Sequence, residues 1–237
     1  MNDKDGQIEI LYNFMSQVSS TWNSEYIDEF RKCLIFVGDL SVWIDRLKDI
    51  PQIVLLNSCL NECATANLFC SLGLYKHAMI SLRLCLEHGL FAIQLSTNDL
   101  DFRKWKIGKL DMKWASIVDH ETGIFSKTFI NAYAPEFIER YFELITIATS
   151  VYRECSEYIH GNYETLYCLP EHSKYDAMML KRYITRFESI SYLLSIALTI
   201  RFKEYICDKG FLSDLEQPIM NNIGYLPEVQ LLYKGDK

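Results

Sequence analysis

The sequence has 237 residues, enough for one large domain, and 49% of them are hydrophobic and 14% aromatic. This apolar content excludes an intrinsically disordered chain, and a total of only 10 Gly and 5 Pro favours long helices over many short strands. The formal net charge of −7 excludes a protein whose whole surface binds nucleic acid, so any contact with a polyanion must be local.

Eight cysteines are scattered through helical patterns, without the paired C-x2-C spacing of a thiolate zinc site. The N-terminal residues do not resemble a secretion signal, and no apolar run reaches the ~20 residues needed to span a bilayer. We therefore expect a cytoplasmic protein with no membrane contact, no metal and no cofactor. Its cysteines should be reduced and mostly buried, among them Cys59, Cys63, Cys70 and Cys85.

Apolar residues recur at helical spacing along almost the whole chain, and no segment alternates as a half-buried strand does. Over residues 26–44 they form one stripe, which ends near Pro51. Residues 53–72 are apolar around most of the helix, a pattern typical of the centre of a bundle, and Gly73 is expected to end that helix. Further helices are expected over residues 74–95 and from a cap at Asn98 to about Val118.

Residues 119–135 contain Gly123 and lack periodicity, so we expect a loop there. A strong helix is expected from Pro135 to Gly161, followed by a linker with Pro170 and a last long helix over residues 178–200. The expected class is all-α. It would comprise a helical extension over residues 1–52 that packs on the bundle, the bundle itself over residues 53–208, and an irregular tail over residues 209–237.

The helix that begins at Pro135 has an apolar stripe that includes Phe142 and Ile159, and a polar face that contains Thr146, Thr149, Ser150, Arg153, Ser156, Glu157 and His160. Arg153 and His160 are seven residues apart, which places them within roughly 20° of one face and about 10 Å apart along the axis. An imidazole can take the proton of a ribose 2′-hydroxyl, and a guanidinium can hold the phosphate bidentately. A pair of this kind can therefore cleave RNA without a metal ion. The alternative is a helix-end histidine near an exposed arginine.

A second pair of the same kind, Arg83 and His88, lies ~140° apart around its helix and so faces two directions. Arg83 and Glu87 are one turn apart on a strongly apolar helix. They form either a structural ion pair or a support that orients Arg153 or His160.

One strongly basic segment interrupts this acidic sequence, with Trp105 and Trp114 interleaved. Its cations are Arg103, Lys104, Lys106, Lys109 and Lys113. Cations and aromatic rings together suit phosphates and bases, so the segment is a candidate RNA-binding surface. The alternative is a solvated helix face whose tryptophans belong to the core.

Two segments carry a resemblance to the HEPN family. Residues 75–87 resemble its early core helix, with an aromatic residue, an alanine, then Leu-Arg and a glutamate one turn later. Arg153-Glu-Cys-Ser-Glu-Tyr-Ile-His160-Gly161 is similar to its motif helix, in which an arginine precedes a histidine by four to six residues. The resemblance covers roughly residues 53–205.

The resemblance implies a helical bundle that pairs as a homodimer, with the Arg/His helices facing each other across a cleft. Many such proteins are metal-independent endoribonucleases that act as toxins or in antiviral defence. It implies Arg153 and His160 as catalytic residues, with a supporting set of Glu154, Ser156, Glu157, Arg83, Glu87 and Tyr163. Members usually carry Asn, Asp or His where this chain has Glu154, and some toxins carry a tyrosine two residues after the histidine, whereas Tyr163 lies three after His160.

Two other functions stay open. One is a catalytically silent HEPN dimer that binds RNA or a partner protein in a defence or toxin–antitoxin assembly. The other is a purely structural helical adaptor, which predicts that Lys104, Lys106 and Lys109 can be neutralised without consequence.

Overall fold

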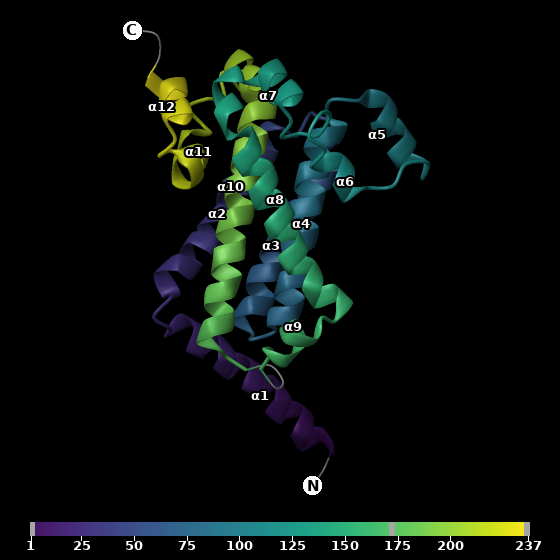
Figure 1. Cartoon of the computed structure of the whole chain (residues 1–237). Coiled ribbons are helices and arrows are strands. Elements are labelled where there is room, and N and C mark those ends of the chain that lie inside the picture. The colour runs from purple at the N-terminus through teal and green to yellow at the C-terminus, as the bar shows by residue number, and fades with distance from the viewer. Residues whose placement is uncertain (1–2, 171–173, 235–237) are drawn as a thin grey trace.

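The computed structural model describes residues 3–170 and 174–234, and these residues form helices and no strands (Figure 1). The all-α class predicted from the sequence is therefore confirmed. The long helices are α1 (Asp3–Trp22), α2 (Ile27–Arg46), α3 (Ile53–Ser71), α4 (Tyr75–Leu95), α8 (Tyr141–His160) and α10 (Ala177–Asp208). The short ones are α5 (Asp99–Lys106), α6 (Trp114–Ile117), α7 (Lys127–Tyr133), the 3-10 helix η1 (Pro135–Arg140), α9 (Tyr163–Tyr167), α11 (Glu216–Ile223) and α12 (Pro227–Lys234).

The centre of the bundle is α4, which contacts α3, α8 and α10. The sequence pattern had predicted α3 for this place, and that prediction is wrong. α3 buries one face, with Leu55, Leu56 and Cys59, while Val54 and Leu68 on its other side are exposed. A helix that is apolar all round need not be covered all round.

α4 and α10 approach closely at Gly89. A Cβ atom at this position would lie 2.4 Å from Cδ2 of Leu194 and 3.0 Å from Sγ of Cys59, so only glycine fits without displacing a neighbour. The buried Tyr183 on α10 donates its hydroxyl to Oδ1 of Asn67 on α3 at 2.8 Å. Asn67 in turn donates to the carbonyl of Cys33 on α2 at 3.1 Å, so three helices share one satisfied polar network.

Two of these helices, α3 and α4, are long and apolar enough to cross a membrane on length and composition alone. The expectation that no apolar run reaches that length is therefore wrong. In this fold the most apolar part of α4 is 67% buried and that of α3 is 39% buried. Core helices pass the same test of length and composition.

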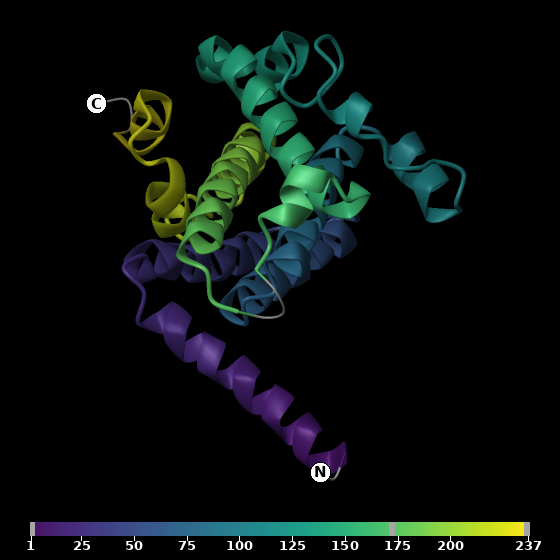
Figure 2. The same ribbon diagram turned by 60° about the horizontal axis from the view of Figure 1, so that its bottom comes forward.

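The N-terminal segment expected to pack on the bundle divides into two different helices. α2 contacts α3, α10 and α11 along its length. α1 contacts only the end of the bundle and projects away from it, as both views show (Figures 1 and 2). Thr21, near the end of α1, is buried, whereas Tyr12 and Met15 are exposed.

Several boundaries differ from those predicted. The helix expected from Asn98 to Val118 ends at Lys106, because Gly108 turns the backbone with φ +67°, and α6 follows separately. The cap at Asn98 is confirmed, since its side chain accepts the N–H of Asp101 at 3.0 Å. The expected loop over residues 119–135 contains α7, which Ser126 caps by accepting from the N–H of Phe129 at 3.1 Å. The helix expected from Pro135 begins as η1 and becomes α-helical at Tyr141.

The expected irregular tail is wrong for most of its length, because α11 and α12 lie within it. Leu215, Ile219 and Ile223 are buried, and α11 packs against α2 and α10. Each helix has only eight residues, too few to establish a helical period in the sequence. Residues 1–2 of the expected extension and 235–237 of the expected tail lie outside the described residues.

Candidate functional site

The candidate site lies on α8, whose two faces differ in burial. Leu144, Ala148, Val151 and Cys155 are buried on the side that packs against α4 and α10. The helix ends at Gly161, which takes left-handed dihedral angles (φ +69°) and donates its N–H to the carbonyl of Glu157. The sequence had predicted this termination, which places His160 in the last turn.

Arg153 and His160 both lie on the exposed face of α8. Neither side chain has an ion pair or a side-chain hydrogen bond to any residue that the structure describes, so both are free to contact a ligand. Thr146 and Thr149 continue the same exposed face toward the start of the helix. These small side chains leave the arginine and the histidine accessible.

Phe142 also lies on this face, with 63% of its surface exposed, although the sequence pattern had assigned it to the apolar stripe. The signal that places it correctly is its spacing from Arg153. Eleven residues bring it back to within roughly 20° of the same direction. Ile159, also assigned to the stripe, is exposed as well.

The three supporting residues on α8 make contacts of their own. Ser156 donates its hydroxyl to the carbonyl of Tyr152 at 2.6 Å. Glu157 accepts the hydroxyl of Thr165 on α9 at 3.3 Å. Glu154 forms an ion pair with Arg186 on α10 and accepts the hydroxyl of Ser150 at 2.9 Å. The contacts of Glu157 and Glu154 hold α8 to α9 and α10, that of Ser156 lies within α8, and none of the three residues is a polar partner of Arg153 or His160.

Arg83 reaches from α4 to the residue next to Arg153. Its guanidinium pairs with Glu87 at 3.3 Å, donates to the hydroxyl of Tyr152 at 2.7 Å and lies 4.6 Å from the centre of that ring. Burial is the main cause that raises the pKa of the Tyr152 hydroxyl. The ion pair therefore lies within α4, and the link to α8 runs through Tyr152.

The competing pair Arg83 and His88 does not form a site. His88 is hydrogen-bonded through Nδ1 to the hydroxyl of Ser58 on α3 at 3.0 Å, whereas Arg83 contacts α8. The two side chains of α4 thus contact different helices, as their ~140° separation predicts.

The basic segment has fewer free cations than its sequence suggests. Arg103 pairs with Asp99 at 2.6 Å and Lys104 pairs with Asp101 at 3.2 Å. Both acids lie one turn before their partners, outside the stretch counted as basic. Lys106, Lys109 and Lys113 are exposed and have no ion pair in the part of the chain that the structure describes.

Trp114 attaches this segment to the candidate site. Its ring stacks on Tyr152 of α8 with centroids 4.0 Å apart and planes 3° from parallel. The aromatic contact brings Lys113, the neighbour of Trp114, to the side of α8 where Arg83 also contacts Tyr152. Trp105 instead stacks on Phe102 within α5, at 6.0 Å.

The sequence reasoning missed three residues near the end of α8: Arg182, Arg186 and Tyr167. Arg182 and Arg186 of α10 line a polar cavity of about 200 Å³ beside the helix. Tyr163 and Tyr167 of α9 stack at 6.0 Å, and each has 78% of its surface exposed. The repeat of an exposed tyrosine after four residues on a helix is the signal that could have identified this pair.

The cysteines follow the prediction in part. Six are buried, and Cys168 and Cys207 are exposed; all eight are free thiols. Sγ of Cys59 lies 3.6 Å from Sγ of Cys85, and this contact together with burial raises the pKa of Cys59 far above its ordinary value. Over residues 3–170 and 174–234 no group of three or more His, Cys, Asp or Glu side chains is arranged to hold a metal ion.

No family model, no curated protein and no solved structure matches this chain. The functional interpretation therefore depends on the site itself. Its elements are an exposed Arg/His pair on one helix, an aromatic link to a basic segment, and a stacked pair of exposed tyrosines beyond the histidine.

Proposed function

We propose that this protein is a cytoplasmic, HEPN-type, metal-independent endoribonuclease that acts in phage defence or as a toxin. The observation that carries the proposal is the exposure of both Arg153 and His160 on one face of α8, with neither side chain engaged by another described residue. A catalytic arginine or histidine must be accessible to its substrate, and both side chains meet this requirement.

The chemistry needs only these two groups. His160 takes the proton of a ribose 2′-hydroxyl, and the oxygen attacks the adjacent phosphorus. The bond from phosphorus to the 5′ oxygen breaks, and a protonated imidazole returns a proton to that leaving oxygen. Arg153 holds the non-bridging oxygens and stabilises the charge that develops on them. The products are a 2′,3′-cyclic phosphate and a 5′-hydroxyl.

A homodimer follows from the resemblance, with two copies of α8 facing each other. Support comes from the small exposed residues Thr146 and Thr149, which permit close approach, and from Phe142, an exposed aromatic ring at the other end of the same face. In such a dimer the two Arg/His pairs lie in one cleft, where one histidine can act as the base and the other as the acid.

RNA contacts outside the pair would come from the free cations Lys106, Lys109 and Lys113. Arg103 and Lys104, expected to contribute as well, are neutralised by their acidic partners, so their share is smaller. The stack of Trp114 on Tyr152 supports a continuous surface from this segment to α8.

A catalytically silent HEPN dimer that binds RNA or an antitoxin-like partner is the second candidate. The observation that favours it is Glu154, which stands where the family pattern has Asn, Asp or His and pairs with Arg186 instead of contacting Arg153. In this second candidate function the protein forms the dimer but does not cleave RNA.

Cleavage of total RNA in EDTA by the purified protein tests the proposal, beside His160→Ala and Arg153→Ala. The matched controls are His120→Ala, also an exposed histidine, and Arg31→Ala, an exposed arginine on α2. Loss of cleavage in the first two variants alone, with an unchanged sedimentation coefficient, supports the enzyme. Absence of cleavage by a folded, dimeric wild type favours the silent module.

A further inference from the structure

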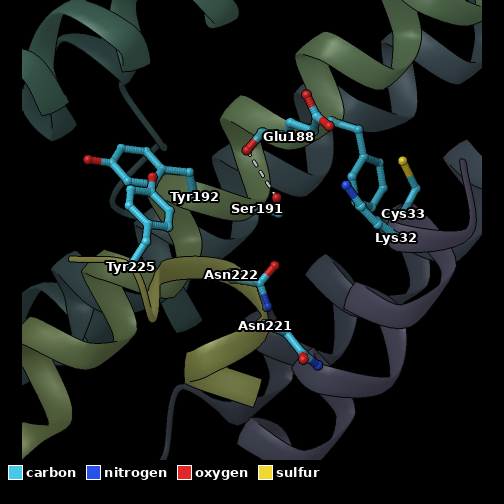
Figure 3. Close-up of a pocket in the computed structure, with 9 residues that line it drawn as sticks. Lys32, Cys33, Glu188, Ser191, Tyr192, Asn221, Asn222 and Tyr225 are labelled. Atoms are coloured by element: carbon cyan, nitrogen blue, oxygen red, sulfur yellow. Dashed lines mark hydrogen bonds between the residues drawn. The ribbon is translucent and has the colours of Figure 1, made fainter. Parts of the chain in front are cut away.

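A cavity of about 310 Å³ lies on another part of the molecule, between α2, α10 and α11 (Figure 3). Tyr192 and Tyr225 stand at one end of it and Lys32 at the other. Glu188 and Asn222 line the stretch between them. None of these residues belongs to the proposed ribonuclease site.

A buried carboxylate fixes the orientation of Asn222. Asp39 is only 8% exposed and accepts Nδ2 of Asn222 at 2.9 Å and Nδ2 of Asn221 at 3.1 Å. A carboxylate can only accept, so it selects the amide nitrogen of each asparagine. The other N–H of Asn222 is donated to the carbonyl of Pro218 at 2.9 Å. Both amide hydrogens are thus used, and the oxygen of Asn222 remains on the cavity side (Figure 3).

Ser191 and Glu188, which line the cavity beside Asn222, are also hydrogen-bond acceptors. The hydroxyl of Ser191 donates to the carbonyl of Glu188 at 3.0 Å, which leaves only its lone pairs for a ligand. The carboxylate of Glu188 has no ion pair among the residues that the structure describes. Glu188, Ser191 and Asn222 therefore line the cavity between its two ends, and neither Ser191 nor Asn222 has a hydrogen left to donate to a ligand.

We propose that this cavity binds an organic cation that carries a guanidinium or ammonium group. Such a group supplies several N–H donors to Glu188, Ser191 and Asn222. It also brings a positive charge to Glu188, which has no ion-pair partner within 4 Å among the described residues. Tyr192 donates its hydroxyl to Glu143 at 2.8 Å, so only its ring is available to a ligand in the cavity. The face of an aromatic ring attracts a cation. At ~30 Å³ per water-sized group, the cavity holds about ten non-hydrogen atoms, enough for a guanidinium on an alkyl chain.

Lys32 makes the proposal sharply testable, because its charge has the opposite effect. An ammonium at the far end of the cavity repels a bound cation, so neutralising it strengthens binding of a cation and weakens binding of an anion. Glu188 gives the reverse signs. The two residues together report the charge of the ligand.

Isothermal titration of the full chain with agmatine tests the site, in parallel with the blocked tripeptide Gly-Arg-Gly. Glu188→Gln is expected to weaken binding roughly fivefold, Lys32→Gln to strengthen it by a similar factor, and Glu204→Gln, an exposed glutamate of α10 outside the cavity, to leave it unchanged. Tighter binding of agmatine indicates a free small cation, and tighter binding of the peptide indicates an arginine side chain of a partner.

The proposal is overturned if neither probe binds at low millimolar concentration. It is also overturned if Glu188→Gln binds as Glu204→Gln does, or if Lys32→Gln weakens binding. None of these results bears on RNA cleavage, because the cavity shares no residue with α8. Circular dichroism of each variant keeps loss of folding apart from loss of binding.

Discussion

Replacement of Arg83 by Met is expected to lower the free energy of unfolding by about 2–3 kcal/mol. Arg83 and Glu87 lie 3.3 Å apart, with 16% and 19% of their side-chain surfaces exposed. At an effective dielectric constant of ~20 their attraction is about 5 kcal/mol, most of which offsets desolvation. Removing one partner of a fully buried pair costs ~3–5 kcal/mol, and the remaining exposure here reduces that figure. The variant also loses the hydrogen bond to Tyr152.

Urea unfolding followed by circular dichroism measures this loss, together with the single variant Glu87→Met and the double variant. Thermal unfolding of Arg83→Met should show a midpoint about 4–12 °C lower, at ~2–4 °C per kcal/mol for a chain of this size. The double variant leaves no unpaired charge, so its loss in free energy of unfolding should be ~1–2 kcal/mol smaller than the sum of the losses in the two single variants. Strict additivity of the two substitutions would refute the reasoning.

Three further predictions concern the core and the buried acid. Tyr183→Phe leaves the buried oxygen of Asn67 without its donor and should cost about 1–3 kcal/mol in urea unfolding. Gly89→Val should cost ~1–3 kcal/mol through overpacking, whereas Gly38→Val, which meets no atom within 4 Å, should be nearly neutral, as thermal unfolding can show. Burial raises the pKa of Asp39, so the folded state holds its proton more tightly than the unfolded chain does. The stability of the wild type relative to Asp39→Asn should therefore fall as pH rises from the unfolded pKa of about 3.9 through the folded pKa, and unfolding at a series of pH values checks the sign.

The helical class and the ends of the long helices could be predicted because periodicity, caps and glycines act locally. Gly161 ended α8 and Asn98 began α5 as expected. The central position of α4 could not be predicted in this way. α3 is equally apolar, and only the packing of α8 and α10 decides which helix is covered. Short helices such as α11 could not be predicted from the sequence, because their burial depends on contacts with distant segments.

The Arg/His face of α8 could be predicted from spacing alone, and the partners of its neighbours could not. The pairing of Glu154 with Arg186 joins residues 32 positions apart and depends on how α8 meets α10. The number of free cations in the basic segment is lower than predicted because Asp99 lies one turn before Arg103 and pairs with it, a spacing that is visible in the sequence. Counting the acidic residues one turn before the segment predicts the pairing of Arg103 and Lys104.

The end groups left on a defined single-stranded RNA, cut in EDTA by the wild type and by His160→Ala, test the central claim most directly. The proposed mechanism predicts 2′,3′-cyclic phosphate and 5′-hydroxyl ends from the wild type, and loss of both in the variant. Products with 5′-phosphate ends, or cleavage by folded His160→Ala at the rate of the wild type, would contradict the assignment of Arg153 and His160 as the catalytic pair.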